Sequence, residues 1–282
     1  MCTGINIGGR EILSGRPAVM AIVNVTPDSF YSGSRTQEAE AIRERVMQAA
    51  AEGADIIDVG GYSSRPGADD VSAEEELRRV SLAVGIIREV LPDMPVSLDT
   101  FRSGVAAGVL DKFGACIVND ISAGELDPRI MDVAASFGVP YIAMHMRGTP
   151  ADMQRRTQYG DIAAEVASYL ASRAEAARRA GISQIILDPG FGFAKTTRQN
   201  YDLLAGMDGI VSLGYPVLAG VSRKSMIYKV LDITPAEALN GTTALHWECL
   251  RQGAAILRVH DVKAAVETVK LFGYYMSDET VR

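Results

Sequence analysis

The chain has 282 residues, with 28 Lys and Arg against 35 Asp and Glu, so its formal net charge is −7 at pH 7. This acidic balance argues against a general nucleic-acid binder, and an anionic ligand would have to meet positive charge gathered at one place. The length suits one α/β barrel, which needs about 250 residues, although two small domains would also fit.

The cysteines indicate a reducing compartment. Cys2, Cys116 and Cys249 are widely spaced and form no CxxC motif, which is typical of reduced thiols. No apolar run approaches the roughly 18 residues of a membrane span, and the N-terminus lacks the apolar core of a signal peptide. We therefore expect a cytoplasmic protein.

Short apolar strands alternate with amphipathic helices along the whole chain. Their nearly continuous apolar character is typical of parallel strands covered by helices. The eight predicted strands are 19–25, 54–60, 95–100, 116–121, 140–145, 184–189, 216–222 and 256–260.

Capping signals mark several of the helices between these strands. Ser72 and Glu75 have capping-box spacing ahead of a helix over 72–91, and 234–237 offers a second such box with proline at the first helical position. The helix within 126–138 should be short. Left-handed helix ends are expected at glycines, namely Gly53, Gly114, Gly181, Gly253 and Gly273.

Eight βα units without a linker favour a single (β/α)8 TIM barrel over 1–282. The alternative, a doubly wound dinucleotide-binding sheet, would usually carry GxGxxG after its first strand, where this chain has NVTPDSF. Residues 1–14 resemble a small hairpin around Gly8 and Gly9 that would close the bottom of the barrel.

Polar side chains follow nearly every predicted strand, at the end that is the catalytic face of a barrel. Some of them could simply cap the next helix, although this does not account for Arg258, His260 or Lys224. The set comprises Asn24, Ser63, Ser64, Asp99, Asn119, Asp120, His145, Asp188, Ser222, Arg258 and His260.

One cluster of these residues is cationic. Arg65, Arg258 and His260 suit a phosphate group, because phosphate in barrels often sits near the last strands and the arginine fork matches its oxygens. Arg65 could instead pair at the surface with Asp69 or Asp70.

A second cluster combines carboxylates with an amide. Asp99, Asn119 and Asp188 could form hydrogen bonds with the edge of a flat heterocycle, or they could hold a divalent metal, and their spacing alone leaves both readings open.

A third cluster lies in GVSRKS. Lys224 could reach a ring carbonyl or a carboxylate, with Ser222 as a small hydrogen-bond donor. His145 could be a base or a structural hydrogen-bond partner.

Eight segments, in order, resemble the dihydropteroate synthase family. They are MAIVNVTPDSF, GGYSSRPGA, VSLDT, IVNDISAG, YIAMHM, ILDPGFGFAK, GVSRKS and ILRVHDV, and they cover nearly the whole chain. The combination of NVTPDSF, DPGFGF and SRK is highly specific, whereas each alone would only be suggestive.

The resemblance implies a pterin-binding TIM barrel that joins 7,8-dihydropterin pyrophosphate to p-aminobenzoate in folate synthesis. It implies Mg²⁺ dependence, competition by sulfonamides, a homodimer formed through outer helices, and a carbocation-like intermediate. Two alternatives remain: a methyltetrahydrofolate-dependent corrinoid methyltransferase, and a non-catalytic pterin-binding paralogue.

The resemblance also assigns roles by position. The pterin would be held by Asp99, Asn119, Asp188 and Lys224. The pyrophosphate would be held by Asn24, Ser64, Arg65, Arg258 and His260, with Asn24 also reaching Mg²⁺. The p-aminobenzoate pocket would contain Ser222, Lys224, Phe193 and Arg65, with the loops 26–36 and 61–70. Catalysis would depend on Lys224, Arg258, His260 and Asp99.

Two loop residues depart from the family pattern. Tyr62 stands where GGESTRPG has its glutamate, and Ser32 stands where SFSDGG has its aspartate, while Asp28 is retained. Ser32 would supply no charge to the intermediate. These departures motivate the non-catalytic alternative.

Overall fold

Eight parallel strands form a closed barrel in the computed structural model, which describes residues 4–25, 35–62 and 71–277. The strands are β3 (Ala18–Asn24), β4 (Ile56–Gly60), β5 (Val96–Asp99), β6 (Ile117–Asp120), β7 (Tyr141–Met144), β8 (Ile185–Asp188), β9 (Leu218–Ala219) and β10 (Ile256–Val259). Their spatial order is β8-β7-β6-β5-β4-β3-β10-β9. An isolated parallel bridge between Leu187 and Val217 closes the ring.

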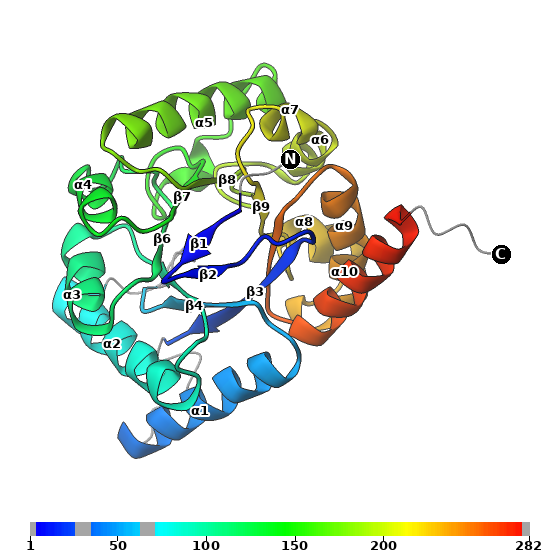
Figure 1. Ribbon diagram of the computed structural model, residues 1–282. Coiled ribbons are helices and arrows are strands. Elements are labelled where there is room, and N and C mark those ends of the chain that lie inside the picture. The colour runs from blue at the N-terminus through cyan, green and yellow to red at the C-terminus, as the bar shows by residue number, and fades with distance from the viewer. Residues whose placement is uncertain (1–3, 26–34, 63–70, 278–282) are drawn as a thin grey trace.

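Helices form a layer around the barrel (Figure 1). They are α1 (Arg35–Ala51), α2 (Ala73–Val90), α3 (Ser103–Phe113), α4 (Arg129–Ser136), α5 (Ile162–Arg179), α6 (Thr197–Ala205), α7 (Asp208–Val211), α8 (Ser225–Leu231), α9 (Leu239–Arg251) and α10 (Val262–Met276), with the short 3-10 helices η1 (Met153–Arg155) and η2 (Pro235–Glu237). No helix in the described part of the chain is long and apolar enough to cross a membrane.

All eight predicted strands are confirmed, and β9 differs most from its predicted length. It has two residues where seven were expected. Pro216 has no N–H to donate to a ladder, and beyond Ala219 the chain leaves the sheet toward the open end of the barrel.

The helix-end predictions are confirmed with two corrections. The Ser72 hydroxyl accepts from the amide of Glu75 at 3.2 Å, α4 is short, and the first four of the five glycines have positive φ. Gly273, in contrast, lies inside α10, where Phe272 and Tyr275 on either side of it pack against Trp247. The capping box at 234–237 is formed as predicted, with the Thr234 amide donating to Glu237 Oε2 at 3.0 Å and Pro235 in the first position, but the helix it begins is the short 3-10 helix η2.

The N-terminal hairpin closes the bottom of the barrel, as predicted. Its strands are β1 (Asn6–Ile7) and β2 (Arg10–Glu11), paired antiparallel, and Figure 1 shows them across the barrel's end. Ile5, Ile7 and Leu13 are buried in one cluster with residues at the starts of the barrel strands. This hydrophobic plug leaves the opposite end of the barrel for a site.

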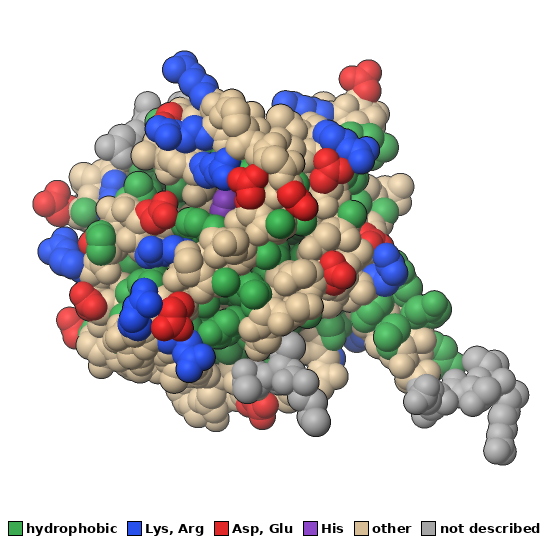
Figure 2. Space-filling view, turned by 90° about the horizontal axis from the view of Figure 1, so that it is seen from above, with side chains coloured by type: hydrophobic (Ala, Val, Ile, Leu, Met, Phe, Trp, Pro, Cys, Tyr) green, Lys and Arg blue, Asp and Glu red, His purple; other side chains and the backbone are tan. Residues whose placement is uncertain are grey.

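Large hydrophobic side chains are exposed on the last helices. Figure 2 shows hydrophobic side chains gathered at one side of the molecule. We call the exposed large hydrophobic residues of α8, α9 and α10 the apolar face, without implying that they are contiguous: Val230, Leu231, Leu239, Leu271, Tyr274, Tyr275 and Met276. An apolar surface of this kind on a folded domain often marks an interaction site.

Candidate active site

The strand ends converge because inward-facing residues recur every second position along a strand. Four isoleucines of the bottom plug are each followed, two residues later, by a polar side chain. The four pairs are Ile56 and Asp58, Ile117 and Asn119, Ile186 and Asp188, and Ile256 and Arg258. The polar layer therefore lies directly above the plug.

Arg258 is the centre of this polar layer. Its Nε donates to Asp58 Oδ2 at 2.7 Å, and its terminal Nη2 donates to Asp99 Oδ2 at 2.6 Å. The other oxygen of Asp58 accepts from Asn119 Nδ2 at 3.2 Å. Residues from β4, β5, β6 and β10 thus form one network.

Asp58 is the member of this network that sequence reasoning missed. Its side chain is completely buried, yet within ADIIDVG it was taken as part of an apolar strand. A charged residue is almost never fully buried unless it is paired. The sequence signal that could have identified it is a carboxylate placed two residues after Ile56, and therefore on the same inward face of the strand.

Burial sets the protonation of the two predicted pterin acids. It raises the pKa of Asp99 to about 7; the positive charge of Arg258 opposes this shift, and the nearby Asp58 adds to it. Burial likewise raises the pKa of Asp188, against the attraction of Lys224. Asp188 also accepts from the amide of Gly190 at 2.7 Å, which fixes the orientation of its carboxylate.

Lys224 lies between the acids and an aromatic ring. Its ammonium donates to the carbonyl of Phe191 and lies 4.7 Å from the centre of the Phe193 ring, within cation–π range. Burial lowers its pKa to about 8, although the negative charge of Asp188 works in the other direction.

Ser222 and His260 form a separate pair. Ser222 Oγ lies 3.0 Å from His260 Nδ1 and accepts from the His260 amide at 3.2 Å. Arg45 on α1 donates to the His260 carbonyl at 2.8 Å. The structure thus brings Ser222, predicted for the aminobenzoate pocket, next to His260, predicted for pyrophosphate; both roles stay predictions.

Asn24 lies at the same level of the barrel as the acids. In the ladder register Asn24 is opposite Gly60, Gly60 is opposite Asp99, and Asp99 is opposite Asn119. A Cβ at Gly60 would lie 3.4 Å from Asp99 Oδ2 and 3.5 Å from Asn24 Oδ1. Gly60 therefore keeps the space between these two side chains open.

The side-chain oxygens around Asn24 fit Mg²⁺ only if waters and substrate phosphates supply the other ligands. Mg²⁺ commonly uses one or two protein oxygens plus waters and substrate phosphates, and the Asn24 carboxamide offers one such oxygen. Among the described residues no group of three or more His, Cys, Asp or Glu side chains could hold a metal. The residues present fit a metal that arrives with a phosphorylated substrate. Arg258 pairs with Asp99, which does not favour the rival metal site on Asp99, Asn119 and Asp188.

Several predicted residues lie outside the described ranges. They are Ser63, Ser64, Arg65, Asp69, Asp70, Asp28, Ser32 and most of the two loops. Tyr62 is described: its ring packs edge-on against Phe101 at 5.4 Å, with the Arg102 guanidinium 5.2 Å from its centre.

His145 is a structural hydrogen-bond partner in this structure. Burial lowers its pKa to about 2, and the positive charge of Lys195 acts in the same direction. Its Nδ1 lies 2.9 Å from Lys195 Nζ. Lys195, almost fully buried, was missed by sequence reasoning, which used the segment ILDPGFGFAK only for the family resemblance.

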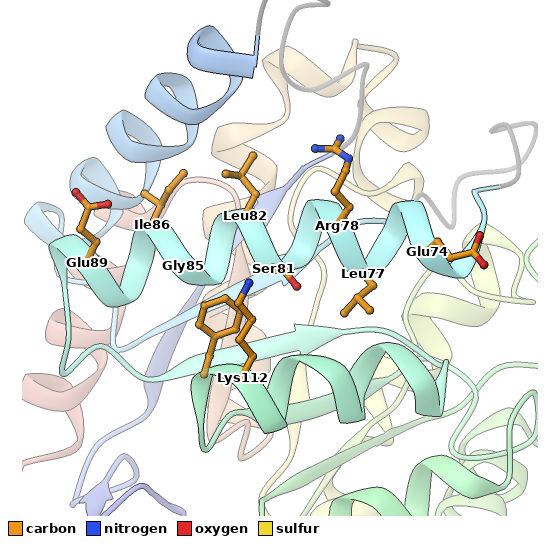
Figure 3. Close-up of a pocket in the computed structure, with 10 residues that line it drawn as sticks. Glu74, Leu77, Arg78, Ser81, Leu82, Gly85, Ile86, Glu89 and Lys112 are labelled. Atoms are coloured by element: carbon orange, nitrogen blue, oxygen red, sulfur yellow. The ribbon is translucent and has the colours of Figure 1, made fainter.

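A groove on the outer surface is a separate feature. It lies between α2 and α3 and is lined by residues including Leu77, Leu82 and Phe113 (Figure 3). None of the predicted site residues within the described ranges lines it, so the strand-end network remains the candidate active site.

Comparison with known proteins identifies the family. The model of the pterin binding enzyme family matches residues 20–260. The chain belongs to this family. The dihydropteroate synthase of Synechocystis sp. is 44% identical over 259 residues, which are 91% of this chain and 89% of that protein.

Solved structures of related enzymes share the fold throughout. The dihydropteroate synthase of Xanthomonas albilineans with 4-aminobenzoic acid is 39% identical, with a TM-score of 0.90 over 98% of this chain and 99% of that chain. The same enzyme with 7,8-dihydropteroate has a TM-score of 0.86 at 37% identity, covering 98% and 99% of the two chains. A sulfonamide complex of the Yersinia pestis enzyme is 35% identical, with a TM-score of 0.89 over 97% and 98%.

Proposed function

We infer that this chain is a dihydropteroate synthase, which condenses 7,8-dihydropterin-6-ylmethyl diphosphate with p-aminobenzoate to give 7,8-dihydropteroate and pyrophosphate. The observation that carries this function is the network of Arg258, Asp58, Asp99 and Asn119 beside Asp188 and Lys224 at the open end of the barrel. Relatives that match almost the whole chain are dihydropteroate synthases.

The pterin binds among the acids and the amide. An aminopyrimidinone edge presents adjacent N–H donors, and a carboxylate oriented like that of Asp188 accepts two hydrogen bonds at once. Asn119 both donates and accepts, and Lys224 donates to the ring carbonyl. Asp99 completes the pocket, with Arg258 holding its carboxylate in place.

The pyrophosphate binds on the cationic side of the same opening. Arg258 and His260 supply donors at the end of β10, and Asn24 supplies them at the end of β3. Ser64 and Arg65 are assigned to this subsite by the family motif alone. Mg²⁺, held by Asn24 and the diphosphate, would neutralise part of the leaving group's charge.

The reaction proceeds by ionisation. The C–O bond at the pterin methylene breaks with its electron pair leaving on pyrophosphate, and the aniline nitrogen then forms the C–N bond and releases its proton to solvent. The cationic side chains stabilise the departing charge. No strong general base is needed, which agrees with His145 being neutral and directed at Lys195.

The p-aminobenzoate lies against the turn after β8. The Phe193 ring supplies an aromatic surface, and the Lys224 ammonium beside it suits a carboxylate. Ser222 and Arg65 complete this pocket in the proposal.

We further propose a cytoplasmic homodimer. The apolar face of α8, α9 and α10 is the surface that supports a dimer interface. Cys116 and Cys249 are free and buried, which agrees with a reducing compartment.

The test of the function is product formation. The purified protein with both substrates and Mg²⁺ should yield 7,8-dihydropteroate by chromatography, and a sulfonamide should compete with p-aminobenzoate. Pterin binding without any coupled product would favour the non-catalytic alternative.

A further inference from the structure

Two lysines donate hydrogen bonds to the carbonyls of one turn. The turn follows β8 and runs from Gly190 to Lys195. Lys224 donates to the carbonyl of Phe191, while Lys195 donates to the carbonyls of Gly190 at 2.8 Å and Phe193 at 3.0 Å. Of these two lysines, only Lys224 has a role in the proposed reaction.

Lys195 has every ammonium hydrogen accounted for. An ammonium carries three donors and no acceptor. Besides the two carbonyls it meets Nδ1 of His145 at 2.9 Å, and this nitrogen accepts because an ammonium can only donate. Two acceptors in the turn itself and a third on His145, which follows β7, determine the position of the Nζ atom.

This arrangement is costly for folding alone. All three acceptors are neutral groups, and burying a charge that makes no hydrogen bond to a carboxylate is unfavourable; the negative charge of nearby Asp188 offsets only part of this cost. Burial accordingly lowers the pKa of Lys195 well below its ordinary value. A buried cation retained at such a cost invites a functional explanation.

The turn itself has an unusual backbone. Ala194, next to Lys195, has a φ of 51°, a left-handed conformation that is uncommon for a residue with a side chain. Such conformations persist when surrounding contacts fix them. The contacts here include Asn200, whose Oδ1 accepts from the Gly192 amide at 2.6 Å.

We propose that Lys195 is a positioning residue that fixes the 190–195 turn so that Phe193 and Lys224 are aligned for p-aminobenzoate. The Lys195 ammonium fixes the carbonyls of Gly190 and Phe193, which lie on either side of Phe191 and Gly192 in the chain. These two residues contact Lys224, since a Cβ on Gly192 would lie 3.1 Å from Lys224 Cδ. This inference rests on the proposed function, and it adds a group that does not itself touch substrate.

The test compares two substitutions by steady-state kinetics. Lys195→Met keeps the length of the side chain but removes all its donors, whereas Lys195→Gln keeps an amide donor. We expect the methionine variant to raise KM for p-aminobenzoate about ten-fold or more, with KM for the pterin substrate within about two-fold of wild type. The glutamine variant should recover part of this loss.

The matched control is Lys112→Met, an exposed lysine of α3, which should leave both KM values unchanged. If Lys195→Met does not fold, His145→Phe removes one acceptor while keeping an aromatic ring against Tyr169, and it should raise the same KM by a smaller factor. Equal weakening of both substrates, or no change in either, would overturn the proposal. Absence of turnover in the wild type would instead refute the proposed function.

Discussion

Arg258 on β10 donates through Nε to Asp58 on β4 at 2.7 Å, joining residues 200 positions apart in the chain. The pair lies one layer above the hydrophobic plug and below the open end of the barrel. Asp58 therefore orients the guanidinium that also meets Asp99, and its other oxygen holds Asn119. Two residues assigned to different subsites depend on one buried carboxylate.

Replacing Asp58 should impair catalysis without a direct substrate contact. Asp58→Asn removes the charge that pairs with Arg258, and a charged hydrogen bond contributes about 2 kcal/mol. We expect kcat/KM for the pterin substrate to fall about 30-fold, since 1.36 kcal/mol is ten-fold.

The control residue immediately precedes the same strand. Asp55, just before β4, pairs with Arg16 at 2.6 Å at the opposite end of the barrel, so Asp55→Asn should leave kcat/KM unchanged. Equal effects of the two substitutions would contradict the role of Asp58.

The pH dependence should be bell-shaped. Asp99, whose pKa is raised to about 7, gains a proton below that pH and loses the charge that pairs with Arg258; Lys224, whose pKa is lowered to about 8, loses its charge above that pH. The value of kcat/KM for the pterin substrate should therefore peak between these two pH values. In Lys224→Arg the alkaline decline should disappear, because a guanidinium stays charged; an unchanged alkaline limb would assign it to another group.

Asp99 should also affect stability in a defined pH window. Its pKa in the folded state is about 7 against an ordinary value of 3.8, so the folded state binds more protons than the unfolded state between these pH values. The stabilisation is complete below pH 3.8 and is lost as the pH rises through about 7. The free energy of unfolding, measured with urea, should fall with rising pH in the wild type relative to Asp99→Asn between pH 3.8 and about 7. Above that window the difference between the two proteins should be constant. A difference independent of pH would show that Asp99 titrates normally.

Lys224 should affect both substrates, since it lies between the pterin acids and Phe193. Lys224→Ala should weaken both apparent affinities by about ten-fold, the size expected for a charged hydrogen bond. Lys229, exposed on the same helix α8, provides the control substitution to alanine. Loss of affinity for only one substrate would remove Lys224 from the other subsite.

The fold was predictable because it follows from local patterns. Continuous apolar strands, glycine at helix ends and the hairpin around Gly8 and Gly9 each act over a few residues, and the parallel order follows from their alternation. The helix end predicted at Gly273 was wrong. The helix α10 continues through Gly273 to Met276, and Phe272 and Tyr275 there pack against Trp247, which is distant in sequence.

The site was predictable to the extent that polarity at a strand end indicates chemistry. Asp99, Asn119, Asp188, Lys224 and Arg258 were singled out in this way, and their roles stay predictions. The ion pair between Arg258 and Asp99 joins β10 to β5, which are separated in the sheet by β3 and β4, so the sequence could not reveal it. Asp58 and Lys195 were missed because their importance comes from burial. Burial is decided by which elements pack around a residue, and the residue type alone does not reveal it.

The central claim is tested most directly by pyrophosphate release from the pterin diphosphate, measured with and without p-aminobenzoate in the presence of Mg²⁺. The account predicts rapid release that requires both substrates and matches the dihydropteroate formed mole for mole. No release with either mixture, or methyl transfer from a reduced folate without pyrophosphate chemistry, would contradict it.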